Sequence, residues 1–335
     1  MKKLAFGVDI GGINTAFGLV DEKGDLFGES VISTRAYPNY QDYPRYVADL
    51  CEAMKLLVAA VNFEFELIGI GVGAPNANFY KGTIETPANL WKFTADDPVH
   101  DESLRMFNFA DDIKAHFPDV PVYVTNDANA ATIGEMVYGN AKGMKDFIMV
   151  TLGTGVGGGI VINGKVYSGF NYAGGELGHI VIQAGGVPCG CGRRGCWEAY
   201  SSATALIRMT NEKLEECAAS GRKTVMTELV EKSGKASGRT AFDAMRAGDE
   251  AGSEVVNTYV YYLAQGLINI INIFQPEVLS IGGGVSNEGD YLLDLLVPLV
   301  RAEVYGQGIV KGTDIRIATL GNDAGIIGGA VLGLK

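Results

Sequence analysis

One pattern occurs twice in the chain: FGVDIGGINTAFGLVDEKG at residues 6 to 24 and IMVTLGTGVGGGIVINGK at residues 148 to 165. Each stretch reads as an apolar strand, a glycine-rich polar turn, a second apolar strand and then a tight turn. Self-similarity on this scale indicates that the chain is built from two related units. The two stretches therefore predict two β-hairpins, one at the start of each half of the fold.

Short apolar runs and helical patterns alternate around these hairpins. The elements expected are helices at 45–61 and from about 127, strands at 67–73 and 122–124, mainly helices from 198 to 274, a strand at 277–284, a helix near 290–304, a strand at 315–320 and a last helix from about 323. Such alternation is typical of an α/β protein. We expect domains at 1–125 and 126–322, with the last helix, 323–335, packed back on the first domain.

The length and composition of the chain argue against a nucleic-acid-binding protein and against a membrane protein. The 335 residues are enough for roughly two domains. The 27 Lys and Arg against 39 Asp and Glu give a formal charge of −12, which repels a polyanion such as nucleic acid. Hydrophobic residues make up 47% of the chain, but no apolar run approaches the roughly 20 residues that a membrane helix needs. Because Met1-Lys2-Lys3 leads directly into a strand without an apolar signal core, cytoplasmic residence is expected.

Three glycine turns are candidates for nucleotide binding: DIGG at 9 to 12, TLGTGVGGG at 151 to 159 and IGGGV at 281 to 285. A strand that ends in Gly-Gly exposes backbone N–H groups that can donate hydrogen bonds to phosphate oxygens, and Asp9 adds a carboxylate able to hold Mg²⁺ through water. The candidate residues are Asp9, Gly11, Gly12, Gly153, Thr154, Gly155, Gly282, Gly283 and Gly284.

Any one of these turns alone is more simply an ordinary hairpin, but three together favour a bound triphosphate. Neither GxGxxG in a βαβ unit nor GxxxxGK[ST] occurs, which argues against dinucleotide-binding and Walker-type sites.

A candidate general base lies where VYVTNDANAATIGE, residues 122 to 135, passes from a strand into a helix. Asp127 could be no more than a helix N-cap. In phosphoryl transfer to an alcohol, however, a carboxylate near the acceptor takes its proton, which contributes roughly 10²- to 10⁴-fold. Asn126 can both donate to and accept from a sugar hydroxyl. Further polar groups on glycine-rich loops complete a candidate sugar pocket: Asn89, Glu176, His179 and Glu198.

Three of the five cysteines, Cys189, Cys191 and Cys196, lie within eight residues, and His179 precedes them. Three thiolates and one imidazole make a closed tetrahedral zinc site without an open position for water, so its role would be structural. The alternatives are reduced free thiols or a cysteine pair oxidised after purification. A rigid loop here would hold Glu176 and Glu198, which flank the cysteines, against the sugar.

These motifs together resemble the ROK (repressor, open reading frame, kinase) family over essentially the whole chain. The matching marks are DIGG followed by Asn14, NDANAA at 126–131, LGTGVGGG at 152–159, GELGH at 175–179, CGCGRRGCWE at 189–198 and the late IGGGV. The resemblance implies a two-domain actin-like ATPase and sugar-kinase fold with an interdomain cleft that closes over ATP and sugar, and commonly a homodimer or homotetramer.

The resemblance also implies an activity: ATP-dependent phosphorylation of a hexose hydroxyl, with glucose as the first expectation and Asp127 as the base. It places Asn126, Glu176, His179 and Glu198 on sugar hydroxyls. His179 would bind zinc through one ring nitrogen and sugar through the other.

The chain departs from the family pattern at two places. Ile13 occupies the position after DIGG where the family has threonine, so either Thr15 supplies the missing hydroxyl beside the phosphates or ATP affinity is lower. The charged stretch at 93–107 is longer than the family's loop at this point, and it bears on the rim of the sugar pocket.

Three other functions share some of these motifs with a glucose kinase. ROK repressors keep the sugar and zinc motifs but carry an N-terminal helix-turn-helix domain, for which a first strand at about residue 3 leaves no room. Kinases for N-acetylmannosamine, N-acetylglucosamine, fructose or allose differ by only a few contacts at the pocket rim. A sugar-binding protein without catalysis would not need Asp9, Asp127 and two glycine turns together.

Overall fold

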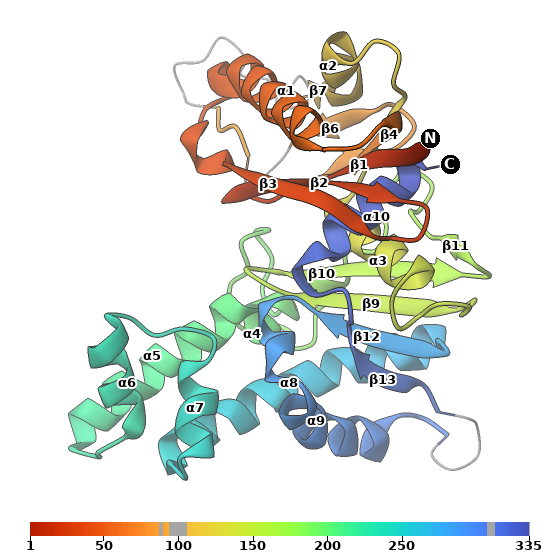
Figure 1. Cartoon of the computed structure of the whole chain (residues 1–335). Helices are drawn as coiled ribbons and strands as arrows, with labels where there is room; N and C mark the ends of the chain where they lie inside the picture. Colours follow the sequence, from red (N-terminus) through yellow and green to blue (C-terminus); the bar gives the residue numbers. More distant parts are fainter. Residues whose placement is uncertain (87–89, 94–105, 307–311, 335) are drawn as a thin grey trace.

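The computed structural model describes residues 1–86, 90–93, 106–306 and 312–334. Asn89 and most of the 93–107 stretch lie outside the described residues. The chain forms two lobes, one above the other in Figure 1, each built on a five-stranded sheet. Two helices, α3 (Asp127–Val137) and α10 (Ala324–Gly333), lie between the two sheets.

The first sheet has the order β3-β2-β1-β4-β8. Its strands are β1 (Lys2–Ile10), β2 (Asn14–Asp21), β3 (Leu26–Ser33), β4 (Phe65–Gly73) and β8 (Val122–Thr125). β1 and β2 form the predicted antiparallel hairpin, and β4 and β8 add in parallel. The outer face of this lobe carries α1 (Tyr43–Ala60), α2 (Phe109–His116) and a small sheet of β5 (Ala77–Asn78), β6 (Thr83–Glu85) and β7 (Met106–Phe107).

The second sheet repeats this plan in the order β11-β10-β9-β12-β13. Its strands are β9 (Phe147–Leu152), β10 (Val156–Ile162), β11 (Lys165–Val166), β12 (Val278–Gly282) and β13 (Asp314–Ile317). β9 and β10 form the second predicted hairpin, while β12 and β13 run parallel to β9. The repeat in the sequence is therefore a repeat of sheet topology.

Helices cover the far side of the second sheet and form the largest core. They are α4 (Glu198–Ser201), α5 (Ala203–Ser220), α6 (Val225–Ser233), α7 (Thr240–Arg246), α8 (Glu250–Phe274) and α9 (Asp290–Glu303). Trp197 is fully buried against α8, where a Cβ on Gly266 would lie 2.0 Å from its indole ring. Among the helices that the structure describes, none is both long enough and apolar enough to span a bilayer.

The layer between the lobes is packed backbone against backbone. A Cβ on Gly7 of β1 would lie 1.7 Å from the carbonyl oxygen of Ile326 in α10, and a Cβ on Gly328 would lie 1.7 Å from that of Ala130 in α3. Only glycine permits such close approach. α10 is thus held against the first sheet and against α3, so the helix that begins at Asp127 has a fixed position between the lobes.

Candidate active site

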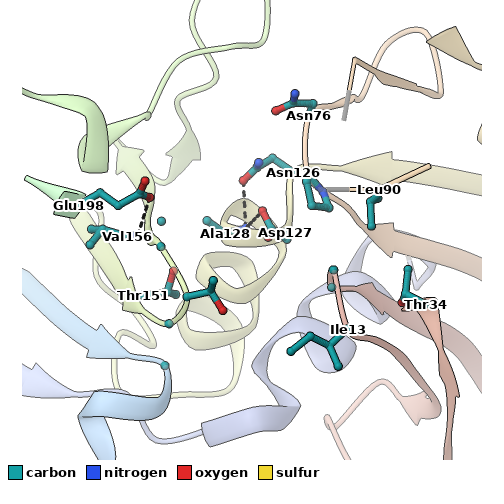
Figure 2. Close-up of a pocket in the computed structure, with 18 of the residues that line it drawn as sticks. Ile13, Thr34, Asn76, Leu90, Asn126, Asp127, Ala128, Thr151, Val156 and Glu198 are labelled. Atoms are coloured by element: carbon teal, nitrogen blue, oxygen red, sulfur yellow. Dashed lines mark hydrogen bonds between the residues drawn. The ribbon is translucent and has the colours of Figure 1, made fainter. Parts of the chain in front are cut away.

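A cleft of about 720 Å³ opens between the two lobes. All three glycine turns reach it, through Gly11 and Gly12, through Gly153, Thr154 and Gly155, and through Gly283; the predicted sugar-binding residues Asn126, Asp127, Glu176, His179 and Glu198 line it as well. Figure 2 shows Glu198, Val156 and Thr151 on one wall, Ile13, Thr34 and Leu90 on the other, and Asp127 between them at the start of α3. Residues far apart in the sequence therefore meet in one cavity.

The start of α3 fixes the direction of the candidate base. Asn126 is the N-cap, because its side-chain oxygen accepts hydrogen bonds from the N–H of Ala128 at 3.0 Å and of Asn129 at 3.3 Å. Asp127 is the first helical residue, and its Oδ1 accepts from the N–H of Ala128 at 2.9 Å. The N-cap role therefore accounts for the presence of Asn126 at the helix start, whereas Asp127 is not needed as a cap and faces the cleft.

Three carboxylates at the cleft have raised pKa values: Asp127 and Glu176 line the cleft, whereas Asp9 is not among its lining residues. Burial raises the pKa of Asp127, while the hydrogen bond from the Ala128 N–H opposes that rise. Burial, with the charge of Asp127 adding to it, raises the pKa of Asp9 to about 7. Burial also raises the pKa of Glu176, where His179 lowers it and Asp127 and Glu198 raise it further. Such shifts are common where a site performs acid–base chemistry or binds a cation.

The first glycine turn differs from the prediction at two residues. Thr15 is fully buried, and its hydroxyl is paired with the Thr34 hydroxyl at 2.9 Å and the Tyr46 hydroxyl at 2.7 Å. The prediction that Thr15 replaces the missing phosphate-side hydroxyl is wrong, because this side chain faces α1 rather than the cleft. Asn14 is exposed outside the lining of the cleft and contributes its carbonyl oxygen to the turn, accepting from the Gly11 N–H at 3.0 Å.

The second turn is tied to Glu198. The Val156 N–H donates to Glu198 Oε2 at 3.0 Å, and a Cβ on Gly155 would lie 2.4 Å from the same oxygen. Nothing described lies within 4 Å of a Cβ on Gly153, so its backbone is open to a ligand.

The third turn reaches the cleft through one residue. Gly283 adopts the left-handed φ of 82° and lines the cleft, whereas Gly282 and Gly284 are not among its lining residues. Gly282 is the last residue of β12, and a Cβ there would meet Met149. Of the three glycines predicted to contact the nucleotide at this turn, only Gly283 lies in the described lining of the cleft.

Four predicted metal ligands come together beside the cleft. The ligand atoms of His179, Cys189, Cys191 and Cys196 all lie within 4.8 Å of one another. His179 Nδ1 is 3.7 Å from Cys189 Sγ, and the sulfurs of Cys191 and Cys196 are 3.6 Å apart. Three sulfurs and one ring nitrogen are a donor set that suits tetrahedral zinc. Since His179 also lines the cleft, the cluster is joined directly to the candidate sugar site.

One wall of the cleft was not predicted. It comes from irregular segments of the first lobe: Thr34, Arg35, Tyr37, Pro38, Pro75, Asn76, Leu90, Trp91 and Lys92. Leu90 and Trp91 directly follow Asn89, which the sequence placed at the sugar pocket, but the others belong to no predicted motif. Tertiary hydrogen bonds help to place them, such as Lys92 N–H to the Pro38 carbonyl at 2.8 Å. No local sequence signal could have placed them there.

Two sheets of one topology, a helix pair between them and a cleft lined by glycine turns define the two-domain fold shared by actin-like ATPases and sugar kinases. The chain belongs to the ROK family, whose model matches residues 5–335. Both the expected fold class and the expected family are thereby confirmed.

Individual relatives cover nearly the whole chain. It is 36% identical to a glucokinase of Halalkalibacterium halodurans over 330 residues, 97% of this chain and 93% of that protein. A ROK family glucokinase from Streptomyces griseus, solved in complex with glucose and AMPPNP, is 31% identical with a TM-score of 0.79 and 98% of each chain covered. A xylose repressor of Bacillus spizizenii is 30% identical over 264 residues, 79% of this chain and 60% of that protein.

Proposed function

We propose that the protein is an ATP-dependent hexokinase that converts glucose to glucose 6-phosphate. The observation that carries this proposal is the position of Asp127, a buried carboxylate in one cleft with three glycine turns and a set of polar side chains suited to a sugar. The similarity to glucokinases, one of them solved with glucose and an ATP analogue, supports the same assignment.

In the proposed reaction Asp127 is the general base. Its carboxylate takes the proton of the sugar's 6-hydroxyl as that oxygen forms a bond to the γ-phosphorus, while the bond between this phosphorus and ADP breaks. ADP, glucose 6-phosphate and the proton leave. Because burial raises the pKa of Asp127, the carboxylate is a better proton acceptor than an exposed aspartate would be.

The nucleotide would lie along the glycine turns of both lobes, where the backbone at Gly12, Gly153 and Gly283 faces the cleft. Asp9 suits a Mg²⁺ site, because burial and Asp127 raise its pKa and no described group donates a hydrogen bond to it. A magnesium ion there, reached through water, would offset phosphate charge.

For the sugar, we assign hydroxyl contacts to Asn126, Glu176, His179 and Glu198, and to Asn89, which lies outside the described residues. Zinc held by His179 and the three clustered cysteines would have a structural role, fixing the loop that carries these side chains. We further propose that the enzyme acts in the cytoplasm, where ATP is available, as a homodimer or homotetramer.

The direct test measures ADP release with Mg-ATP and one sugar at a time. The panel is glucose, N-acetylmannosamine, N-acetylglucosamine, fructose and allose. We expect the highest kcat/KM with glucose. A higher value with another sugar would reassign the substrate, and no sugar-dependent ADP from folded protein would remove the kinase assignment.

The pH dependence of turnover tests the state of the base. Asp127 is active only when ionised, and burial raises its pKa above the ordinary value of 3.8. We therefore expect kcat/KM for glucose to be constant near pH 8 and to fall, approaching tenfold per unit, below a pKa higher than 3.8. An acid limb of kcat/KM with a pKa at or below 3.8, with the fold intact by circular dichroism, would contradict this.

A further inference from the structure

Arg35 is a cation on the cleft wall that no motif predicted. It lies in the 3₁₀ turn Thr34–Ala36, directly after β3, and lines the same cleft as Gly11, Gly12 and Asp127. Its backbone N–H donates to the carbonyl oxygen of Ile13 at 3.2 Å. The residue is therefore attached to the glycine turn that would face the phosphates of a nucleotide.

A buried network holds this turn in place. The Thr34 hydroxyl is 2.9 Å from that of Thr15, which is in turn 2.7 Å from the Tyr46 hydroxyl of α1. Thr15 and Tyr46 are fully buried and Thr34 nearly so, and buried hydrogen-bond networks of this kind fix geometry. Thr15 thus acts one step away from the cleft, by anchoring the turn on which Arg35 is carried.

The Arg35 guanidinium is not used by the fold. It forms no ion pair with any carboxylate that the structure describes, although such pairs occur elsewhere in this lobe, for example between Arg45 and Asp49 at 3.8 Å. Within the described lining of the cleft, Arg35 and Lys92 are the only lysine or arginine side chains. Lys92 is tied to Pro38 beside Leu90 and Trp91, whereas Arg35 is tied to the glycine turn itself.

A cation beside the first glycine turn would offset the negative charge of the cleft. Asp127, Glu176 and Glu198 line it, and each repels a phosphoryl group that approaches the sugar. Ile13 offers no hydroxyl or charge on the first turn. An arginine fork pairs with phosphate oxygens through two parallel hydrogen bonds, which a lone ammonium cannot do.

We propose that Arg35 binds the phosphoryl group in transfer, on ATP before the reaction and on the sugar after it. This rests on the proposed kinase function and adds a catalytic residue to it. The arginine would compensate for Ile13 on the first glycine turn.

The test compares Arg35→Ala and Arg35→Lys with Arg45→Ala, which removes an equal charge from the same lobe outside the cleft. With glucose as substrate, we expect Arg35→Ala to lower kcat roughly 10²-fold with little change in the KM for glucose. Arg35→Lys should recover part of this loss, added guanidinium ion should partly rescue Arg35→Ala, and Arg45→Ala should match the wild type.

Binding measurements separate this role from a structural one. In Arg35→Ala the Kd for glucose 6-phosphate should rise about tenfold or more, while the Kd for glucose and the melting temperature stay at wild-type values. Wild-type kcat and product affinity in Arg35→Ala would overturn the proposal and leave the kinase assignment standing. Equal losses of glucose affinity and thermal stability, without guanidinium rescue, would also overturn it. A wild type inactive on every sugar would instead remove the proposed function.

Discussion

Replacing Asp127 with asparagine is expected to remove nearly all turnover while glucose still binds. The amide oxygen can still accept from the Ala128 N–H, as Asp127 Oδ1 does at 2.9 Å, so the start of α3 should keep its shape. The asparagine side chain itself cannot take the sugar's proton. We expect kcat to fall roughly 10²- to 10⁴-fold, measured as ADP release, with the Kd for glucose measured by calorimetry within a few-fold of wild type.

Asp290→Asn is the matched control. Asp290 is also the first residue of a helix, α9, but it is exposed and lies outside the cleft. The substitution removes the same charge from the same helical position, so it reports any loss caused by the helix dipole alone. Turnover of Asp127→Asn within about tenfold of wild type would contradict a general base at this position.

The two hairpins show how much of the fold could be predicted from the sequence. Alternating apolar residues and glycine-rich turns act over a few residues, so β1 with β2 and β9 with β10 follow from local patterns. The helix start near Asp127 is predicted for the same reason, although the N-cap named from the sequence is Asp127 and the structure gives that role to Asn126. The two hairpins and the helix start, whose sequence signals act over only a few residues, are therefore found in the structure.

Thr15 shows where such reasoning fails. Successive side chains of a strand point to opposite faces. If β2 started one residue earlier or later, a side chain that faces the core would face the cleft instead. β2 begins at Asn14, which turns the Thr15 hydroxyl toward Tyr46 and Thr34. The sequence of the turn does not determine which way the Thr15 side chain points, because the residues that hydrogen-bond to its hydroxyl are many positions away along the chain.

The wall formed by the first lobe was not predictable for a related reason. Arg35 is brought to the cleft by a backbone hydrogen bond to Ile13, and Lys92 by one to Pro38. Neither contact leaves a periodic or compositional mark in the sequence. The cluster of His179 with Cys189, Cys191 and Cys196, in contrast, is predictable, because closely spaced cysteines with a nearby histidine are typical of a metal site.

Loss of the proposed zinc site is the second change expected to have a large effect. Cys191 is exposed, so Cys191→Ala removes one ligand without opening a cavity in the core. The loop from His179 to Glu198 would lose its cross-link. Because His179 and Glu198 both line the cleft, we expect zinc content to fall and the KM for glucose to rise roughly 10- to 100-fold, measured by metal analysis and by kinetics on the same preparation.

Cys217→Ala is the control, since Cys217 is buried in α5 and is not one of the four clustered ligands. It should keep about one zinc per chain and the wild-type KM for glucose. Prolonged chelation of the wild type should reproduce the Cys191→Ala kinetics, and added zinc should reverse them in the chelated wild type more fully than in the variant. Zinc absent from freshly prepared, unchelated protein, or an unchanged KM after Cys191→Ala, would show that the loop holds the sugar-facing side chains without a metal.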